Sequence, residues 1–277
     1  MAAPFACLLL LTPSSAEQSR TPGKETRASA TSLHLSRNTS SFRTVSRQSN
    51  NAAWKAHVEL QQSKWRSSEA MRLKIRGIDV GRQHQVARQF ATFHGGGAFR
   101  GETVICLGAR LGGEVRAFKG LGALAVGVDL EPGEDNMDVL VGDFENLAFP
   151  EASFGFAYCN VLDHINNLAA FAHEVCRVVK PEGFFFAVLY TQAQDVYNGQ
   201  QAITADAYAI LLKEMSPAFS LVRTEDLIDV MRIREHAREI DPASPHLASV
   251  MFRPWRQAIK TLTFKKRGPC AEQAHPR

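Results

Sequence analysis

Four short apolar runs dominate the centre of the chain, and a polar or glycine residue follows each of them. The runs are Val104–Leu107, Ala123–Val128, Val139–Val141 and Phe154–Cys159. Continuous apolar runs of this length, bounded by turn residues, are typical of buried strands in parallel sheets. An amphipathic segment begins a few residues after the first run, beyond a short turn. The pattern therefore predicts an α/β domain with a mostly parallel sheet and helices on both faces.

The segments on either side of these runs predict helices and an antiparallel strand. Residues 52–93 have helical character, and Gly77 and Gly81 are expected to interrupt the helix. A second helix is expected from residue 204 to residue 215. Residues 259–266 alternate apolar and polar side chains, which is typical of an antiparallel strand toward the edge of a sheet.

A glycine-containing turn, residues 108–113, comes directly after the first run. The order strand, tight turn, helix start is that of folds that bind a nucleotide cofactor at the carboxyl end of a strand. Glycine lets the backbone approach a cofactor closely, and the N–H groups at a helix start attract negative charge. A glycine turn also occurs as structural punctuation in many α/β domains, so it is weak evidence by itself.

Polar side chains stand at the ends of the next three runs. Asp129 lies 21 residues after Gly108, close to the spacing at which a carboxylate binds ribose hydroxyls. Asp143 and Asn160 follow the third and fourth runs. Open α/β sheets bind ligands at the carboxyl ends of their strands, so these residues are candidate binding groups. The alternative for each of them is a side chain that caps a turn or a helix.

A series of short motifs follows in a fixed order. They are Gly142-Asp143, Leu147-Ala148-Phe149-Pro150, Ser153-Phe154-Gly155, and a helix end that runs from Glu174 through Lys180-Pro181-Glu182-Gly183. Through these motifs, about residues 100–192 resemble the class I S-adenosylmethionine-dependent methyltransferases of the type 11 group. The resemblance implies a Rossmann-like sheet that is mostly parallel, with an antiparallel C-terminal strand and helices on both faces.

The resemblance also implies S-adenosyl-L-methionine as the cofactor, with a role for each polar position. The glycine turn would line the methionine part, Asp129 would hold the ribose hydroxyls, and Leu130 would pack on the adenine. Asp143 and the backbone N–H of Phe144 would bind the adenine edge, and the carbonyl of Asn160 would meet the amino group. The expected cofactor-binding residues are Gly108, Ala109, Arg110, Gly112, Asp129, Leu130, Asp143, Phe144 and Asn160.

The chain departs from the family pattern at several positions. Cys106 stands where the family usually has an acid, Arg110 where it has glycine, and Gly155 where an acid often follows. Residues 131–138 contain Pro and Gly and predict a loop where most members have a helix. The wall of the cofactor site is expected to be thinner there. A domain that binds the cofactor without catalysing transfer remains an alternative.

Asp163 and His164 are the catalytic candidates, because they follow Asn160 by a few residues in the loop that faces the methyl group in this fold. A histidine suits proton transfer near neutral pH, and an adjacent carboxylate is able to orient it. The alternative is that His164 begins the next helix and packs on the cofactor. The sequence after the fourth run lacks the Asn/Asp-Pro-Pro-Tyr/Phe motif of the nucleic-acid branch, which favours a small-molecule acceptor.

Composition narrows the choice of partners. The net charge is only +4 over 277 residues, and the sequence contains no broad basic stripe of the kind that binds nucleic acid. A membrane-spanning helix needs an apolar run of about 18 residues, and the sequence contains no such run. The five cysteines lack metal-ligand spacing, and Cys106 and Cys159 are expected to be buried thiols. A nicotinamide-dependent oxidoreductase is a further alternative, but residues 108–113 do not form its G-x-G-x-x-G pattern. The oligomeric state stays open.

The N-terminal segment differs in composition from the rest. Residues 1–50 are rich in Ser, Thr and Arg and poor in acids, which is typical of a transit peptide to the chloroplast or, alternatively, the mitochondrion. The apolar stretch 5–11 also resembles a short signal sequence, so a two-part leader is expected. The predicted regions are a disordered leader at 1–50, a helical extension at 51–98, the methyltransferase domain at 99–267 and a disordered tail at 268–277.

Overall fold

The structure is a computed structural model that describes residues 52–133, 136–190, 198–205, 207–227 and 259–270. The predicted leader at 1–50 lies outside these described residues. Among the described helices, none is long and apolar enough to cross a membrane. The same part of the chain contains no group of three or more His, Cys, Asp or Glu side chains that is arranged to hold a metal ion.

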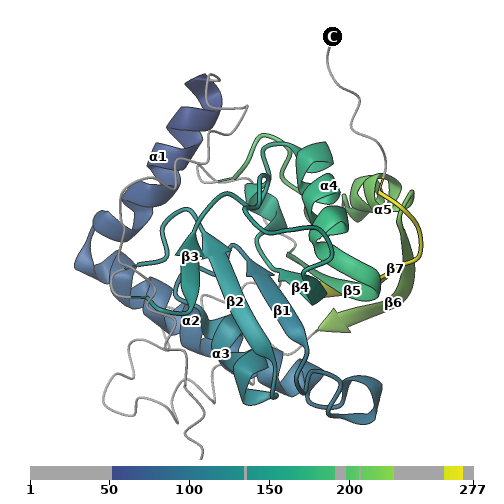
Figure 1. The fold of residues 1–277 in the computed structure, drawn as a ribbon. Coiled ribbons are helices and arrows are strands. Elements are labelled where there is room, and N and C mark those ends of the chain that lie inside the picture. The colour runs from purple at the N-terminus through teal and green to yellow at the C-terminus, as the bar shows by residue number, and fades with distance from the viewer. Residues whose placement is uncertain (1–51, 134–135, 191–197, 206, 228–258, 271–277) are drawn as a thin grey trace, which may run out of the picture. The chain divides into compact units, whose positions relative to one another are not determined.

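A seven-stranded sheet forms the centre of the described structure, with the order β3-β2-β1-β4-β5-β7-β6 (Figure 1). Its strands are β1 Thr103–Leu107, β2 Leu124–Asp129, β3 Val139–Val141, β4 Phe154–Cys159, β5 Val179–Tyr190, β6 Phe219–Leu227 and β7 Ile259–Lys266. Strands β1 to β5 pair in parallel, and β7 runs antiparallel to both β5 and β6. The predicted Rossmann-like sheet with an antiparallel C-terminal strand is confirmed.

Strand β7 is the second strand from the edge of the sheet, so it is paired on both sides. It is hydrogen-bonded to β5 on one side and to β6 on the other. Its alternating pattern suggested one solvated face, but Thr261 and Thr263 are as deeply buried as Leu262 and Phe264. Threonine fits a buried pleated surface almost as well as an apolar β-branched residue, so alternation alone did not reveal the second covered face.

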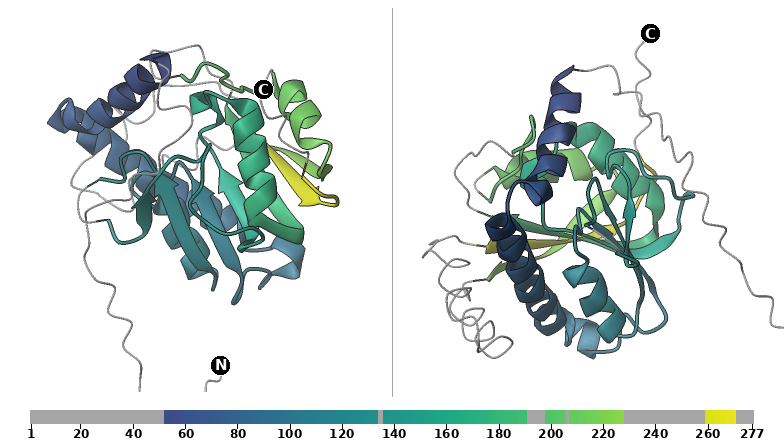
Figure 2. Two further views of the ribbon diagram at one scale, coloured as in Figure 1. Left: turned by 45° about the horizontal axis from the view of Figure 1, so that its top comes forward. Right: turned by 90° about the vertical axis from the view of Figure 1, so that its left-hand side faces the viewer.

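Helices cover both faces of the sheet, as the sequence predicts. They are α1 Ala52–Arg66, α2 Glu69–Phe90, α3 Gly113–Gly120, α4 Leu168–Val178 and α5 Tyr208–Met215, with short 3-10 turns η1 Phe93–Gly95 and η2 Leu162–His164. Helices α2 and α3 pack on one face, and α4 and α5 pack on the other (Figure 2). The predicted helix start at residue 204 is wrong, because residues 204, 205 and 207 are not helical and the helix begins at Tyr208.

The expectation that Gly77 and Gly81 interrupt the first helical segment is wrong. Helix α2 continues through both glycines, and the break lies earlier, between α1 and α2. The Ser68 side chain there accepts a hydrogen bond from the backbone N–H of Met71 and caps α2. A glycine inside a helix costs only about 1 kcal/mol relative to alanine, which the burial of Val86 and neighbouring side chains offsets. Helix α2 thus contributes side chains to the hydrophobic core beside the sheet.

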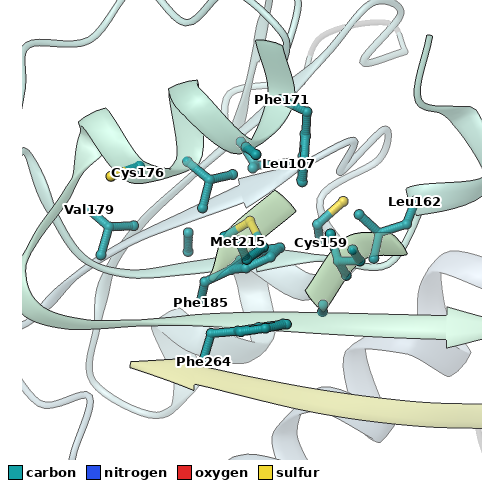
Figure 3. Packing of buried hydrophobic residues seen from close by; sticks show 14 of the residues in the cluster. Leu107, Cys159, Leu162, Phe171, Cys176, Val179, Phe185, Met215 and Phe264 are labelled. Atoms are coloured by element: carbon teal, nitrogen blue, oxygen red, sulfur yellow. The ribbon is translucent and has the colours of Figure 1, made fainter. Parts of the chain in front are cut away.

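Aromatic side chains fill the core on both faces. On the α4 side, Phe171 from α4 and Met215 from α5 pack over Phe185 and Phe264 of the neighbouring strands β5 and β7 (Figure 3). The rings of Phe185 and Phe264 are stacked, with centroids 5.8 Å apart. On the α2 side, a second aromatic cluster lies against the sheet. The two clusters hold the carboxyl ends of β1 and β4 in fixed positions between the helices.

A disulfide joins Cys176 in α4 to Cys270, 94 residues later. Residues 268–270, which the sequence places in a disordered tail, are therefore attached to the domain. The buried Lys266 ammonium supports the same junction by donating to the carbonyl oxygens of Cys176 at 2.7 Å and Val179 at 2.9 Å. These bonds satisfy carbonyl groups at the C-terminal end of α4.

The two cysteines expected as buried thiols are free and buried. Cys106 in β1 stands opposite Tyr158 in β4. Since successive side chains of a strand point to opposite faces, Cys106 and Cys159 lie on different faces of the sheet and do not form a disulfide.

The disulfide generates a stability prediction. Replacing Cys270 with Ser should lower the free energy of unfolding by about 2–4 kcal/mol, because the unfolded chain regains the freedom that a long closed loop removes. Urea unfolding of the full chain, followed by circular dichroism, measures the change. Dithiothreitol should destabilise the native protein to a similar degree and leave Cys270→Ser unaffected. Equal stability of the two proteins without reductant would contradict the prediction.

Candidate cofactor and active site

The turn after β1 has the backbone conformation that glycine favours. Gly108 and Gly112 have φ values of +73° and +82°, in the left-handed region. A Cβ atom on Gly108 would lie 2.1 Å from the Cγ2 atom of Val161, in the loop after β4. The loops after β1 and β4 thus approach each other so closely that a side chain at residue 108 does not fit.

The start of α3 is capped by the protein itself. The backbone N–H of Gly113 donates to the Asp79 carboxylate of α2 at 2.6 Å, and Arg116 forms an ion pair with the same carboxylate. The negative charge expected at this helix start therefore comes from α2. This leaves the turn itself, rather than the helix start, as the ligand-facing part of the motif.

Asp129 joins the ends of β1 and β2. It is buried, and its two carboxylate oxygens accept hydrogen bonds from the backbone N–H groups of Arg110 at 3.0 Å and Glu131 at 2.9 Å. Burial raises the pKa of Asp129, and the Arg110 guanidinium opposes that rise. Asp129 is thus a turn-organising residue. Each oxygen of a carboxylate accepts more than one hydrogen bond, so capacity for a ligand hydroxyl remains.

Asp143 has one oxygen committed and one oxygen without a partner. Its Oδ1 atom accepts from the backbone N–H of Glu145 at 2.8 Å, whereas Oδ2 is buried and unpartnered among the described residues. Burial raises the pKa of this carboxyl. The ring of Phe144 beside it lies close to Gly108 and packs edge-on against Phe171. An unpartnered acceptor next to an aromatic ring suits the amino edge of a planar base.

Glu114 of α3 is a site residue that the sequence interpretation missed. The Asn160 side-chain amide donates to its Oε1 atom at 2.6 Å, and the Arg82 guanidinium of α2 lies 3.6 Å from the same oxygen. The Oε2 atom is buried without a partner in the described part of the chain. Burial raises the pKa of Glu114, and Arg82 opposes that rise. A signal was available: Glu114 lies one helical turn from the buried Phe118, in the apolar stripe of α3.

The same carboxylate explains the departure at Cys106. The Cys106 thiol is buried, and its pKa is raised by burial and by the neighbouring charge of Glu114. Glu114 of α3 thus places a carboxylate near the position at which the family usually has an acid on β1. Asn160, which was predicted to bind the cofactor through its carbonyl, presents its side chain to Glu114 as well.

Asp163 and His164 lie in or beside η2, directly after β4, as predicted. The Nδ1 atom of His164 is buried and has no hydrogen-bond partner among the described residues, so Asp163 does not orient the ring through that nitrogen. Burial lowers the pKa of His164 to about 3, with further lowering by positive charges, first that of Lys64 and then that of Arg110. His164 is neutral at physiological pH and is a weak proton acceptor in the ligand-free protein.

Helix α1 covers the glycine turn and the end of β2. The buried Gln61 side chain accepts a hydrogen bond from the Arg110 guanidinium at 3.4 Å. Gln62 donates to the backbone carbonyl of Leu130, also at 3.4 Å. Leu130, the residue expected to pack on the adenine, therefore lies beneath α1. These contacts place α1 over the positions at which the sequence predicts a cofactor.

The segment between β2 and β3 is a loop, as predicted, and its described residues contain no helix. The Asn136 side chain donates to the carbonyl oxygens of Arg110 at 3.0 Å and Pro132 at 2.8 Å. A direct hydrogen bond to the glycine turn thus replaces the helix that most family members have here.

The sheet order, the glycine turn and the carboxylates at the strand ends define a class I methyltransferase domain. Residues 105–187 match the family model described as a methyltransferase domain, which confirms the type 11 resemblance. This part of the chain is therefore an S-adenosylmethionine-dependent methyltransferase domain, and S-adenosyl-L-methionine is its cofactor. No curated protein matches the sequence.

Solved structures share the fold at low sequence identity. One is the 1,6-didemethyltoxoflavin-N1-methyltransferase of Burkholderia thailandensis, with 17% identity, 78% of this chain and 89% of that chain covered, and a TM-score of 0.51. A second is phosphoethanolamine N-methyltransferase 2 of Haemonchus contortus, with 15% identity, 67% of this chain and 53% of that chain covered, and a TM-score of 0.49. A third is geranyl diphosphate C-methyltransferase of Streptomyces coelicolor, with 15% identity, 66% of this chain and 78% of that chain covered, and a TM-score of 0.48. At 17% identity, the likeness to the Burkholderia thailandensis enzyme shows the fold.

The unpartnered atoms of the site match the chemistry of this cofactor. Asp143 Oδ2 and Glu114 Oε2 are buried acceptors without partners, and Arg110 Nη1 is a buried donor without a partner, among the described residues. S-adenosylmethionine offers an adenine amino group and an ammonium as donors, and a carboxylate as acceptor. Buried polar atoms normally have hydrogen-bond partners, so a ligand with these groups would complete the site.

Asp143 provides a test that separates stability from binding. Because burial raises its pKa, the folded protein keeps the proton to a higher pH than the unfolded chain, and ionisation destabilises the fold as pH rises. Asp143→Asn should therefore be more stable than the native protein at pH 7. The difference should shrink on acidification and vanish below about pH 4, near the ordinary pKa of aspartate.

The same variant should bind S-adenosylhomocysteine about tenfold or more weakly, since the amide would turn a donor toward the adenine amino group. Urea unfolding at several pH values and calorimetry measure the two effects. Glu151→Gln, which removes an exposed carboxylate, should change neither quantity. A less stable Asp143→Asn protein with normal affinity would show that this carboxylate supports the loop only.

Proposed function

We propose that the protein transfers a methyl group from S-adenosylmethionine to a small-molecule acceptor by in-line displacement. The observation that supports this most strongly is a set of polar atoms on Glu114, Asp143 and Arg110 that are buried and unpartnered among the described residues. These residues come from α3, from the loop after β3 and from the turn after β1. Leaving them unpartnered is unfavourable in the absence of a ligand.

In this proposal, different residues bind different parts of the cofactor. Asp129 receives the ribose hydroxyls, and Asp143 and the Phe144 backbone take the adenine edge. Glu114 and Asn160 take the ammonium end, and Gly108, Ala109 and Gly112 lie along the methionine part. The bound cofactor supplies an electrophilic sulfonium methyl group. The contribution of the chain is alignment of donor and acceptor, which for a displacement reaction is a large share of the rate enhancement.

His164 and Asp163 face the acceptor in this proposal. His164 positions the acceptor through a hydrogen bond as a neutral ring, rather than acting as a strong general base. The low pKa of His164, about 3, supports this assignment, and burial is its largest cause. Helix α1, which is hydrogen-bonded across the glycine turn, leaves less access for a polymer than for a small molecule.

Ligand binding tests the proposal. Calorimetry with the full chain should show micromolar affinity for S-adenosylmethionine and S-adenosylhomocysteine, with NAD at least about tenfold weaker. Asp129→Ala should lose about 1–3 kcal/mol of S-adenosylhomocysteine binding, because the ribose hydroxyls lose a charged partner. Asp138→Ala, which removes a nearby carboxylate paired with Lys119, should bind normally. Tighter binding of NAD than of S-adenosylhomocysteine would overturn the proposal.

For location, we propose delivery to a plastid by the leader at residues 1–50. Its Ser-, Thr- and Arg-rich composition supports this. The Cys176–Cys270 disulfide is also uncommon for a protein kept in a reducing cytosol. A fluorescent protein fused behind residues 1–50 should enter plastids of algal cells, whereas the same reporter fused to residues 51–277 should remain outside them. Import of the second fusion would contradict the proposal.

A further inference from the structure

The turn that carries Asp143 leads into an irregular segment. Within residues 143–146, the backbone N–H of Asn146 donates to the Asp143 carbonyl oxygen at 3.1 Å, and that of Glu145 donates to the Asp143 side chain at 2.8 Å. Residues 147–149, which follow, belong to no helix or strand. Backbone polar groups that are removed from water need hydrogen-bond partners, and a segment outside helices and strands finds them in other elements.

Two charged side chains of α4 supply these partners. The Glu174 carboxylate accepts a hydrogen bond from the backbone N–H of Leu147 at 2.6 Å. The Arg177 guanidinium donates to the backbone carbonyl oxygens of Leu147 at 2.9 Å and Phe149 at 2.6 Å. Three backbone groups of residues 147–149 are thus bound by side chains of one helix.

Glu174 and Arg177 also hold each other in a fixed geometry. The guanidinium donates through Nε to Glu174 Oε1 at 2.9 Å and through Nη2 to Oε2 at 2.7 Å. Glu174 is buried. A bidentate pair fixes the planes of both groups, whereas a buried ion pair adds little stability compared with apolar side chains of the same size. The direction of these hydrogen bonds is therefore the main contribution of the pair.

The start and the middle of α4 hold the same turn. The buried Glu145 side chain accepts hydrogen bonds from the backbone N–H groups of Asn166 at 2.6 Å and Asn167 at 3.0 Å, and Asn167 caps the N-terminus of α4. The ring of Phe144 packs edge-on against Phe171, with centroids 5.7 Å apart. Residues 143–149 are thus attached to α4 at its beginning, its middle and its last turn.

Asp143 takes its orientation from this turn. Its Oδ1 atom is bound to the backbone of Glu145, so the direction of Oδ2 follows that of the turn. The Oδ2 atom is buried and has no partner among the described residues. A displacement of residues 147–149 would therefore change the position of the one carboxylate oxygen that is open to a ligand.

We propose that Glu174 and Arg177 are positioning residues for purine selection. By holding residues 147–149, they direct Asp143 Oδ2 at the amino group of adenine. A purine with a carbonyl oxygen at the same ring position is rejected, because two acceptors would then face each other. This inference rests on the proposed function. It assigns the selectivity of the adenine site to two side chains that act through the backbone of the turn.

Two ligands that differ at this ring position test the proposal. S-adenosylhomocysteine carries adenine, and S-inosylhomocysteine carries hypoxanthine, with a carbonyl oxygen in place of the amino group. Calorimetry with the full chain measures the dissociation constants of both, and their ratio is the purine preference. Because both ligands bind only the folded protein, a loss of folded protein changes both constants equally and leaves the ratio unchanged.

The native protein should prefer S-adenosylhomocysteine by about tenfold or more, as expected for a hydrogen bond to a carboxylate. Glu174→Gln should reduce the preference below about threefold, because the amide turns a donor toward Arg177 and the bidentate pair is lost. Arg177→Lys should act alike, because an ammonium group does not replace the planar fork of a guanidinium. Asp143→Asn should abolish the preference. Binding of S-inosylhomocysteine should change little in Glu174→Gln and Arg177→Lys.

Two control variants separate positioning from general effects. Glu182→Gln removes an exposed carboxylate that pairs with Lys265 and Arg267, and it should keep the native preference. Cys270→Ser breaks the disulfide to α4 and lowers stability without removing a hydrogen bond to residues 147–149. It should also keep the native preference, whatever its stability.

The outcomes separate this inference from the proposed function. If the native protein prefers S-adenosylhomocysteine and Glu174→Gln and Arg177→Lys keep that preference, the inference is wrong and the methyltransferase proposal stands. The same holds if the native protein binds both ligands alike, or if Cys270→Ser loses the preference as fully as Glu174→Gln. If the native protein binds neither ligand, the proposed function fails and the inference fails with it.

Discussion

The hydrogen bonds of the Asp129 carboxylate are the interaction on which the site depends. One carboxylate accepts the backbone N–H of Arg110 from the turn after β1 and that of Glu131 from the loop after β2. Both loops therefore have fixed positions before a ligand binds. The Gly108 turn is then held against Val161, which places the loop after β4 beside them. Every other candidate residue is positioned relative to these three loops.

This arrangement concentrates buried carboxylates in one place. Burial raises the pKa of Asp129, Asp143 and Glu114 alike. Arg110 opposes this rise at Asp129, Arg82 opposes it at Glu114, and a backbone hydrogen bond from Glu145 opposes it at Asp143. Such groups reduce the stability of the ligand-free fold, which is a common feature of functional sites. The two aromatic clusters on either side of the sheet and the Cys176–Cys270 disulfide supply stability elsewhere in the domain.

Much of the fold was predictable because its signals are local. Strand ends, the glycine turn and the position of Asp129 follow from short apolar runs and from spacing. The role of Glu114 was not predictable in the same way, because its partners Asn160 and Arg82 come from distant segments. The disulfide joins residues 94 positions apart, and no spacing pattern identifies such a pair. The helix break was predicted at the wrong place because the low helix propensity of Gly77 and Gly81 costs less free energy than the tertiary packing of α2 gains.

Arg110 stands where the family usually has glycine, and its hydrogen bonds connect several parts of the site. Its φ of +38° lies in the left-handed region, which costs a side-chain-bearing residue about 1–2 kcal/mol relative to glycine. In return its backbone N–H binds Asp129, its carbonyl accepts from Asn136, and its guanidinium donates to Gln61 of α1. A single residue thus links the Asp129 carboxylate, the shortened β2–β3 loop and the covering helix. Because of these links, we expect a ligand that moves the turn to move α1 as well. Glycine at this position would remove the bond to Gln61 and keep the bond from Gln62 to Leu130.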